Sequence, residues 1–186
     1  MTIMSRVLYD GKRLRLRAPE RSDIPRFVAW LNDTEVTAGL MLSLPMSLAD
    51  EEEWFENMLK RPAAEHPLVI EIQQGQDWIP IGNCGFNEID WRCRSAEVGI
   101  FIGDKQFWNQ GYGTEAMRLL LCYGFNTLNL NRICLQVYHN NRRAVRAYEK
   151  AGFVHEGRKR QGMFKNGNYI DILLMSVLRS EWSEDA

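Results

Sequence analysis

The stretch FWNQGYGTEA, from Phe107 to Ala116, joins a turn with two glycines to the start of an amphipathic helix. Gly111 and Gly113 lack the β-carbons that would keep an anion away from backbone N–H groups. The positive end of the helix dipole favours an anion at the same place. Because many strand-to-helix turns also contain glycine, the stretch alone leaves two interpretations open, an anion-binding site and an ordinary turn.

The length and composition are those of an ordinary globular domain. The chain has 186 residues, of which 45% are hydrophobic and 25% charged. We therefore expect one domain over residues 1–186, with its core at about 12–180. The longest apolar runs are too short to cross a bilayer, and residues 1–10 lack the apolar centre of a signal peptide. These features predict a cytoplasmic protein that does not enter membranes.

Charge is unevenly distributed along the chain. Residues 1–110 carry 12 Lys and Arg against 17 Asp and Glu, whereas residues 111–170 carry 10 against 3. A basic segment after the glycine turn suits an anionic cofactor, although solvated surface explains it equally well. The four cysteines show no CxxC pairing and the three histidines are scattered, so neither a metal site nor a disulfide framework is expected.

Segments with helical and strand periodicity alternate, which predicts a mixed α/β fold. The strand at 95–102 has aliphatic side chains on one face and Glu97, Gly99 and Phe101 on the other. The arginines of the first strand are expected in solvent. Strands are expected at about 12–17, 68–72, 78–89, 95–102, 132–138, 153–160 and 169–178, the last two joined by a turn at Asn166 and Gly167. Helices are expected from Ser22 or Asp23 to about Asn32, from Ser47 to before Pro62, from Thr114 to Phe125, and from Asn140 or Asn141 to Gly152.

A dinucleotide is one candidate for the anion, since Gly111, Gly113 and Ala116 satisfy the GxGxxG/A template. Two observations count against it. Seven residues separate the turn from the end of the preceding strand, and no Asp or Glu occurs at 116–148 to bind a ribose. A nucleoside-triphosphate P-loop is excluded because the turn contains neither a GxxxxGKS nor a GxxxxGKT pattern.

Three motifs in a fixed order resemble the GCN5-related N-acetyltransferase (GNAT) family. They are AEVGIFI at 96–102, WNQGYGTEA at 108–116 and NNRRAVRAYEKAGF at 140–153. The resemblance covers about 14–178 and is to the branch of ribosomal-protein N-terminal acetyltransferases and bacterial spermidine acetyltransferases. Trp108 departs from the Arg or Gln of the general pyrophosphate motif. The implied fold is a mixed, mostly antiparallel sheet of about seven strands, with helices on both faces and the fourth and fifth strands splayed.

The resemblance also implies a site for acetyl-CoA, with no metal. Backbone groups of Phe101 and Ile102 would pair with the pantetheine amides, whereas the residues alone favour a plain core strand there. Asn141 would touch the cofactor from the other side. Backbone N–H groups would hold the pyrophosphate at Gln110, Gly111, Tyr112, Gly113 and Thr114.

Two side chains are candidates for catalysis by direct attack of an amine in a ternary complex. A protonated amine must lose a proton before it attacks, and Glu97 is the candidate base. The alternative is a strand carboxylate that faces solvent or pairs with Arg94. Tyr148 is the candidate acid for the departing thiolate, and its alternative is an aromatic side chain packed on a helix.

The acceptor is left open between a polyamine such as spermidine and a protein N-terminus. The acidic helix at 51–56 could attract either acceptor, although the helix dipole by itself also favours acidic residues in the first turn of a helix. Other functions stay open, namely a non-catalytic acyl-CoA sensor and an RNA-binding domain, the latter with little sequence support. We expect no nucleic-acid partner, and exposed strand edges allow a homodimer or higher homo-oligomer. The RNA interpretation would use Arg142, Arg143, Arg146, Arg158, Lys159 and Arg160.

Overall fold

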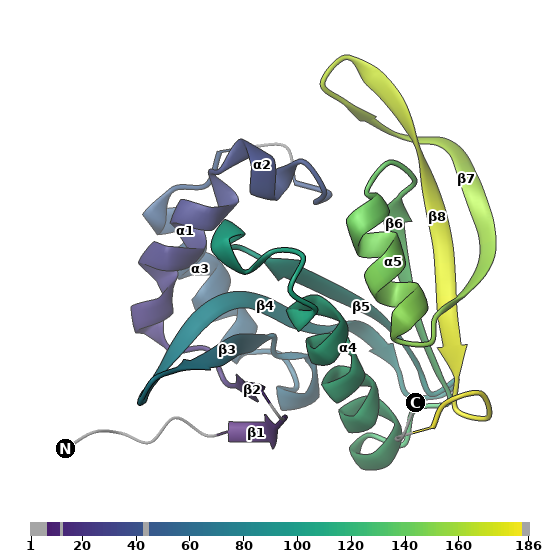
Figure 1. Cartoon of the computed structure of the whole chain (residues 1–186), viewed down its shortest axis with the longest axis horizontal. Coiled ribbons are helices and arrows are strands. Elements are labelled where there is room, and N and C mark those ends of the chain that lie inside the picture. The colour runs from purple at the N-terminus through teal and green to yellow at the C-terminus, as the bar shows by residue number, and fades with distance from the viewer. Residues whose placement is uncertain (1–6, 12, 43–44, 184–186) are drawn as a thin grey trace.

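The computed structural model describes residues 7–11, 13–42 and 45–183, and within them eight strands form one sheet (Figure 1). The strands are β1 (Val7–Asp10), β2 (Leu14–Arg17), β3 (Leu68–Gln74), β4 (Asp77–Asp90), β5 (Ser95–Ile102), β6 (Arg132–Tyr138), β7 (Val154–Lys165) and β8 (Asn168–Leu178). Their order is β1-β2-β3-β4-β5-β6-β8-β7, antiparallel except between β5 and β6. The predicted mixed, mostly antiparallel sheet is therefore confirmed. The edge strand β1 escaped prediction because its four residues show no period-two alternation.

Helices cover both faces of this sheet, as predicted (Figure 1). The α-helices are α1 (Ile24–Leu31), α2 (Thr34–Thr37), α3 (Leu48–Leu59), α4 (Tyr112–Cys122) and α5 (Arg142–Lys150). Short 3-10 turns lie at Arg21–Asp23, Ala63–Glu65 and Lys105–Phe107, and a π-turn at Tyr123–Thr127 follows α4. On one face α4 and α5 bury Met117, Leu120 and Tyr148 against the sheet. On the other, α1 packs Phe27 and Trp30 against Val69.

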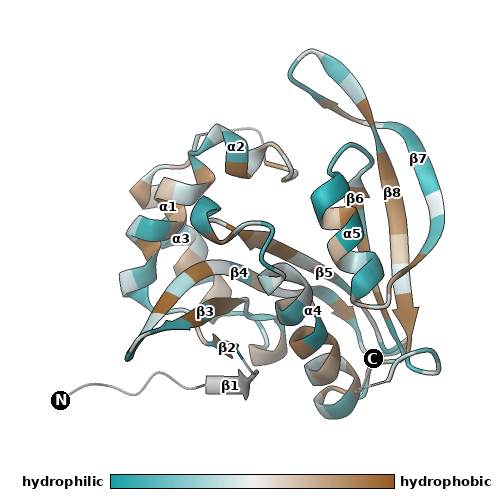
Figure 2. Ribbon diagram, in the orientation of Figure 1, coloured by the Kyte–Doolittle hydropathy of each residue, from teal (hydrophilic) through white to brown (hydrophobic). Residues whose placement is uncertain are grey.

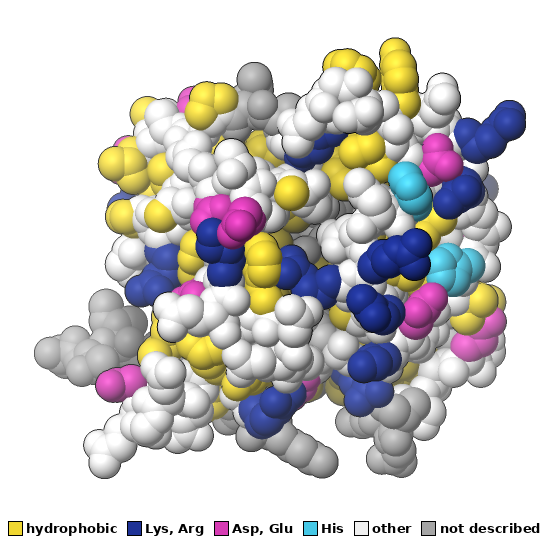
Figure 3. All heavy atoms as spheres, turned by 45° about the horizontal axis from the view of Figure 1, so that its top comes forward, with side chains coloured by type: hydrophobic (Ala, Val, Ile, Leu, Met, Phe, Trp, Pro, Cys, Tyr) yellow, Lys and Arg dark blue, Asp and Glu magenta, His cyan; other side chains and the backbone are white. Residues whose placement is uncertain are grey.

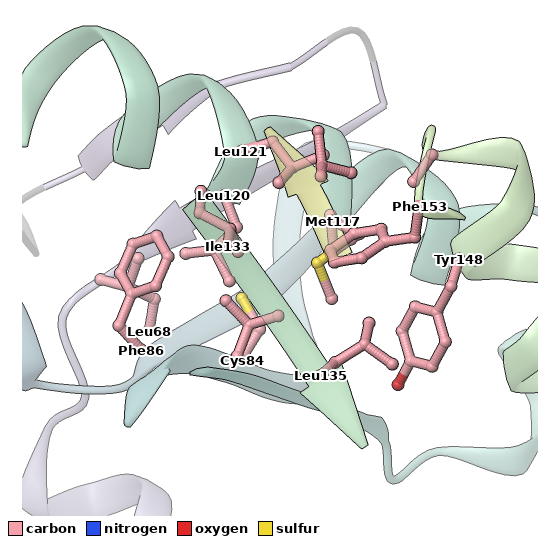
Figure 4. Packing of buried hydrophobic residues seen from close by; sticks show 14 of the residues in the cluster. Leu68, Cys84, Phe86, Met117, Leu120, Leu121, Ile133, Leu135, Tyr148 and Phe153 are labelled. Atoms are coloured by element: carbon pink, nitrogen blue, oxygen red, sulfur yellow. The ribbon is translucent and has the colours of Figure 1, made fainter. Parts of the chain in front are cut away.

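The main core lies between the sheet and the helices α4 and α5 (Figure 4). Met117, Leu120 and Leu121 are fully buried there, beside Ile133 of β6. Gly124 is also part of this face, because an added Cβ would come within 2.6 Å of Ile133. Along β8 the ribbon is largely hydrophobic, whereas β7 at the sheet edge is hydrophilic (Figure 2). The core thus fixes α4 and α5, and with them the glycine turn.

Helix boundaries agree with the predicted caps at two places. Ser47 and Asp50 form a reciprocal capping box at the start of α3, and the Asn141 side chain accepts from Ala144 N at the start of α5. Helix α4 begins at Tyr112, two residues earlier than predicted, because Gly111 adopts φ 87° and acts as the N-cap.

Three predicted strands have limits that differ by two residues or more in the structure, and one of them is β3, which extends to Gln74. β7 extends to Lys165 because Asn166 and Gly167, with φ of 50° and 78°, form a tight turn that lets both strands pair up to it. β2 begins at Leu14, and Lys12 lies outside the described residues.

The prediction that the arginines of the first strand lie in solvent is wrong for one arginine of β2. Arg17 is buried, and its guanidinium donates to Asp23 at 2.7 and 2.8 Å and to Glu71 at 2.7 Å. Both carboxylates are themselves buried. A buried charge needs such partners, so this cluster ties β2 and β3 to the start of α1.

The strands β5 and β6 separate after a short parallel pairing. Register pairs join only Ser95 to Arg132, Ala96 to Ile133 and Glu97 to Cys134. Beyond Glu97 the two strands have no further register pairs, whereas β6 stays paired with β8 up to Tyr138. This is the predicted splay between the fourth and fifth strands of the family fold, which are β5 and β6 here because β1 precedes them.

Glu156 on β7 and Arg132 on β6 form a bidentate ion pair across β8, with N–O distances of 2.5 and 2.6 Å. The Arg132 hydrogen bond lowers the pKa of Glu156 to about 2. A depressed carboxyl pKa adds stability above the unfolded-state pKa, and this contribution disappears as pH falls toward the folded value. We expect Glu156→Gln to lower the unfolding free energy by about 1 kcal/mol at pH 7, a value discounted for the exposure of the pair.

Urea unfolding of wild type and Glu156→Gln between pH 7 and pH 2 measures this effect. The difference in unfolding free energy should shrink as pH falls from about 4.5 toward 2. Glu53→Gln, at an exposed position of α3, is the control. A difference that stays constant with pH would rule out the ion pair as its cause.

Candidate active site

A cavity of about 600 Å³ lies where β5 and β6 separate. Its walls come from α2 and the loop after it, β5, the turn before α4, β6 and α5. The space-filling view shows a hollow at this place, with Lys and Arg side chains along one side (Figure 3). Nine of the ten predicted site residues line this cavity, and Gln110 is the exception.

The glycine turn supplies backbone donors at the N-terminus of α4. The first intrahelical bond runs from Glu115 N to Gly111 O at 3.0 Å, so the N–H groups of Tyr112, Gly113 and Thr114 precede it. Within the described part of the chain, no side chain caps this end. A Cβ built at Gly113 meets no atom of the described residues within 4 Å, so the space that a side chain would occupy there is open. The turn therefore offers three aligned N–H groups to an anion.

Arg13 braces this turn from outside the cavity. Its Nε donates to Glu115 Oε2 at 2.9 Å, and its Nη1 donates to the Gln110 carbonyl at 3.2 Å. Its guanidinium also lies 4.7 Å from the centroid of the Tyr112 ring. These contacts join positions about one hundred residues apart and fix the turn before any anion arrives.

Trp108, which departs from the general motif, connects three elements. Its indole Nε1 donates to the Ile102 carbonyl at 2.7 Å, and the Arg143 guanidinium of α5 stacks 3.6 Å from the ring centroid. Trp108 thus holds the end of β5 and a basic side chain of α5 beside the turn. The aromatic residue has a structural role at a position where the general motif has a polar one.

The two predicted backbone contacts on β5 face opposite directions. The Phe101 carbonyl lies against β4, where a Cβ at Gly82 would come within 2.1 Å of it. Backbone groups of successive strand residues point to alternate sides, so those of Ile100 and Ile102 point away from β4, toward the gap. The Phe101 side chain packs edge-on against Trp30 at 6.2 Å. Of the two predicted residues, Phe101 and Ile102, only Ile102 has its backbone groups at the gap. The backbone groups of Ile100 also lie there, which the sequence did not predict.

Basic side chains of α5 line the cavity next to the turn. Arg143, Arg146 and Lys150 all reach it. Arg118 of α4 donates to the Lys150 carbonyl at 2.8 Å and so holds the end of α5 against α4. This group of cations and the N-terminus of α4 can together hold several phosphate groups.

Asn141 and Thr114 reach the cavity but also have structural bonds. The Asn141 side chain caps α5, and its amide nitrogen lies close enough to Gly39 that a Cβ there would come within 2.5 Å. The Thr114 hydroxyl donates to the Ala147 carbonyl at 3.4 Å, which links α4 to α5.

Tyr148 of α5 is packed in the core and still lines the cavity. Its ring lies 5.8 Å from that of Phe153, and its hydroxyl points away from Phe153 and Met117 (Figure 4). Burial raises the pKa of Tyr148 to about 12. The hydroxyl therefore stays protonated at physiological pH and can act as a hydrogen-bond donor.

Glu97 lies half-buried on the face of β5 opposite the core and lines the same cavity. Gln136 Nε2 of β6 donates to Glu97 Oε2 at 3.0 Å. The alternative partner, Arg94, donates instead to Asn129 Oδ1 at 3.3 Å. Glu97 and Tyr148 thus reach one cavity from two faces of the sheet, and Gln136 is a neighbour that the sequence did not reveal.

A second cavity of about 240 Å³ adjoins the first on the α3 side. Leu40, Asn87 and the residues 99–101 line both cavities. The second one also has Trp54 and Glu65 in its wall. The two cavities therefore share part of their wall, with Glu97 in the first and Glu65 in the second, where Arg61 Nε lies 3.8 Å from Glu65 Oε2.

Lys165, at the end of β7, holds the loop that closes the cavity. Its ammonium donates to the carbonyls of Thr37, Leu40 and Leu42 at 2.6, 2.6 and 2.9 Å. The Tyr138 hydroxyl also donates to the Leu40 carbonyl at 3.2 Å. Leu40 and Met41 of this loop line the cavity, so the hairpin of β7 and β8 positions that wall.

Comparison with known proteins agrees with this geometry. The model of the acetyltransferase (GNAT) domain matches residues 13–154. A spermidine N(1)-acetyltransferase of Vibrio cholerae is 35% identical over 172 residues, covering 92% of this chain and 96% of that protein. A putative ribosomal N-acetyltransferase, YdaF of Bacillus subtilis, is 35% identical over 174 residues and covers 92% and 94%. The crystal structure of the Vibrio cholerae spermidine N-acetyltransferase with CoA and spermine superposes with a TM-score of 0.84 at 32% identity, covering 92% and 98%.

The chain belongs to the GNAT family of acetyltransferases. It is an acetyl-CoA-dependent N-acetyltransferase similar to spermidine N-acetyltransferases. None of the helices in the described part of the chain is long and apolar enough to cross a membrane.

Proposed function

We propose that the protein transfers the acetyl group of acetyl-CoA to a primary amine of a polyamine such as spermidine. The observation that carries this proposal is the pair of adjoining cavities, one with the glycine turn and Glu97 in its wall and the other with Glu65. A polyamine has ammonium groups at both ends of an extended chain. One end would reach Glu97, and another would meet the Glu65 carboxylate.

The residues around the first cavity fit coenzyme A. The N–H groups of Tyr112, Gly113 and Thr114 would hold the pyrophosphate, and Gly111 allows the turn because its φ of 87° suits glycine. The backbone groups of Ile100 and the N–H of Ile102 would pair with the pantetheine amides, since the Ile102 carbonyl already accepts from Trp108 Nε1. Asn141 would contact the cofactor from the α5 side, and the basic residues Arg143, Arg146 and Lys150 would neutralise further phosphate charge.

Two side chains would manage protons during direct attack in a ternary complex. Acetyl-CoA supplies the thioester that accepts the amine and the thiol that leaves. Glu97 would take the proton of the acceptor ammonium, directly or through a water molecule. Tyr148 would donate a hydrogen bond to the leaving sulfur. Because its pKa is about 12, it would transfer its proton only late in the departure of the thiolate.

A protein N-terminus is a second candidate acceptor, because the YdaF relative is named a putative ribosomal N-acetyltransferase. RNA binding has less support, since its proposed residues have other roles. Arg143 and Arg146 line the cavity, Arg158 lies 3.4 Å from Asp171, and Lys159 donates to Gln136.

Thiol release from acetyl-CoA tests the function directly. We expect release with spermidine or spermine and at least tenfold slower release with peptides that end in a free α-amine. Faster release with peptides would assign the protein-terminus acceptor. Tight binding of CoA without release on any amine would favour the acyl-CoA sensor.

Gly113→Phe tests the pyrophosphate site. The open space above Gly113 should accept the side chain without unfolding, but the ring would cover the N–H groups at the start of α4. We expect Kd for CoA to rise at least tenfold in calorimetric titration, while the melting temperature changes little. Gly157→Phe, at an exposed position of β7 where an added Cβ meets only Leu174 Cδ1 at 4.0 Å, is the control for stability. An unchanged CoA affinity would contradict the assignment.

A further inference from the structure

A chain of two hydrogen bonds links Glu97 to a lysine on the edge strand. Gln136 Nε2 donates to Glu97 Oε2 at 3.0 Å, and Lys159 Nζ of β7 donates to Gln136 Oε1 at 2.8 Å. Lys159 is exposed, while Gln136 and Glu97 are half-buried. The three side chains come from β7, β6 and β5, on the face of the sheet opposite the main core.

The lysine decides which end of the Gln136 amide faces Glu97. A side-chain amide has a donor end and an acceptor end, and rotation by half a turn exchanges them. An ammonium can only donate, so it requires the amide oxygen. The NH₂ group must then face Glu97, which has to accept. Glu97 Oε2 accepts this hydrogen bond, so the orientation of the amide fixes the position of the carboxyl group.

The other side chains beside Glu97 do not impose this choice. In the strand register Asn87 of β4 and Cys134 of β6 lie opposite Glu97. Asn87 is neutral, and burial, with a smaller effect of the carboxylates nearby, raises the pKa of the Cys134 thiol, so that it stays protonated. The charged side chain that orients the Gln136 amide is therefore Lys159.

We infer that Lys159 is a positioning residue for acetyl transfer, which acts through Gln136 to hold the Glu97 side chain in one orientation, with Oε1 left for the acceptor amine. This inference rests on the proposed role of Glu97 as the base. Without Lys159 the Gln136 amide can rotate and present its oxygen to Glu97. The carboxylate then loses its donor in a fraction of the molecules, and the attack on the thioester slows.

The test measures kcat and KM for spermidine in six proteins. They are wild type, Lys159→Met, Lys159→Arg, Gln136→Leu, the double variant Lys159→Met with Gln136→Leu, and Arg160→Met. We expect Lys159→Met to lower kcat about tenfold, the size of a lost hydrogen bond to a charged group, with KM within about twofold. Lys159→Arg keeps a cation that donates and should stay within about threefold of wild type. Arg160→Met, the matched loss of one charge on the same strand, should leave kcat unchanged.

The double variant separates positioning from a general effect of charge. If Lys159 acts through Gln136, Lys159→Met should have almost no further effect once Gln136 is leucine. An equal loss in both backgrounds, or equal losses in Lys159→Met and Arg160→Met, would overturn the inference while leaving the acetyltransferase function intact. A wild type that acetylates no amine would refute the proposed function, and the role of Lys159 with it.

Discussion

Replacing Tyr148 with phenylalanine is expected to lower kcat for acetyl transfer about a hundredfold or more, with KM for acetyl-CoA within about threefold. The magnitude is that of a positioned proton donor. Without the hydroxyl, the leaving sulfur loses a donor that the protein holds at the cavity wall. Most of the loss should therefore fall on the chemical step and little on cofactor binding.

The raised pKa adds a second, independent expectation. Because burial raises the pKa of Tyr148 to about 12, its hydroxyl should stay protonated throughout the usual assay range. The wild-type rate should then show no loss from Tyr148 ionisation below about pH 11. A tyrosine with an ordinary pKa would lose its proton near pH 10, and the rate would then fall at a lower pH.

The fold should tolerate this change. Phenylalanine keeps the ring that packs against Phe153, so the melting temperature should change little. Tyr169→Phe removes a hydroxyl from an exposed position of the terminal hairpin and serves as the control. Stopped-flow or steady-state thiol release gives kcat and KM for both variants. A Tyr148→Phe enzyme within about twofold of wild type would exclude the acid role.

Local sequence patterns carried most of the fold prediction. Ser47 and Asn141 mark helix starts through bonds to residues three positions away, and the aliphatic alternation of Ser95–Ile102 defines β5 without reference to the rest of the chain. The glycine turn is likewise a local feature. Such interactions act within a few residues, so a sequence pattern reveals them.

Contacts between distant segments could not be predicted in this way. Nothing near Arg13 indicates that it braces the turn through Glu115, and nothing near Lys159 points to Gln136. The direction of the Phe101 backbone depends on which β5 residues pair with β4, and this register follows from packing. The sequence therefore identified nine positions that line one cavity, whereas the structure supplied their orientation and supporting residues.

Replacing Glu97 with glutamine is expected to lower kcat/KM for spermidine about a hundredfold at pH 7, the typical contribution of a general base. Glutamine keeps a side-chain oxygen that can accept from Gln136, so the local geometry should survive. The variant would react only with acceptor amine that has already lost its proton in solution. A primary amine of the lysine type has a pKa of about 10.4, so its neutral fraction rises about tenfold per pH unit below that value.

The pH profile of this variant is therefore the decisive measurement. The deficit of Glu97→Gln relative to wild type should be largest at low pH and should shrink between pH 7 and pH 9. Glu53→Gln at an exposed position of α3 controls for the loss of one negative charge. A deficit that stays the same at every pH would mean that Glu97 binds the acceptor by charge alone. In that case the proton would have to leave by another route, and the carboxylate would act as an anchor for the ammonium.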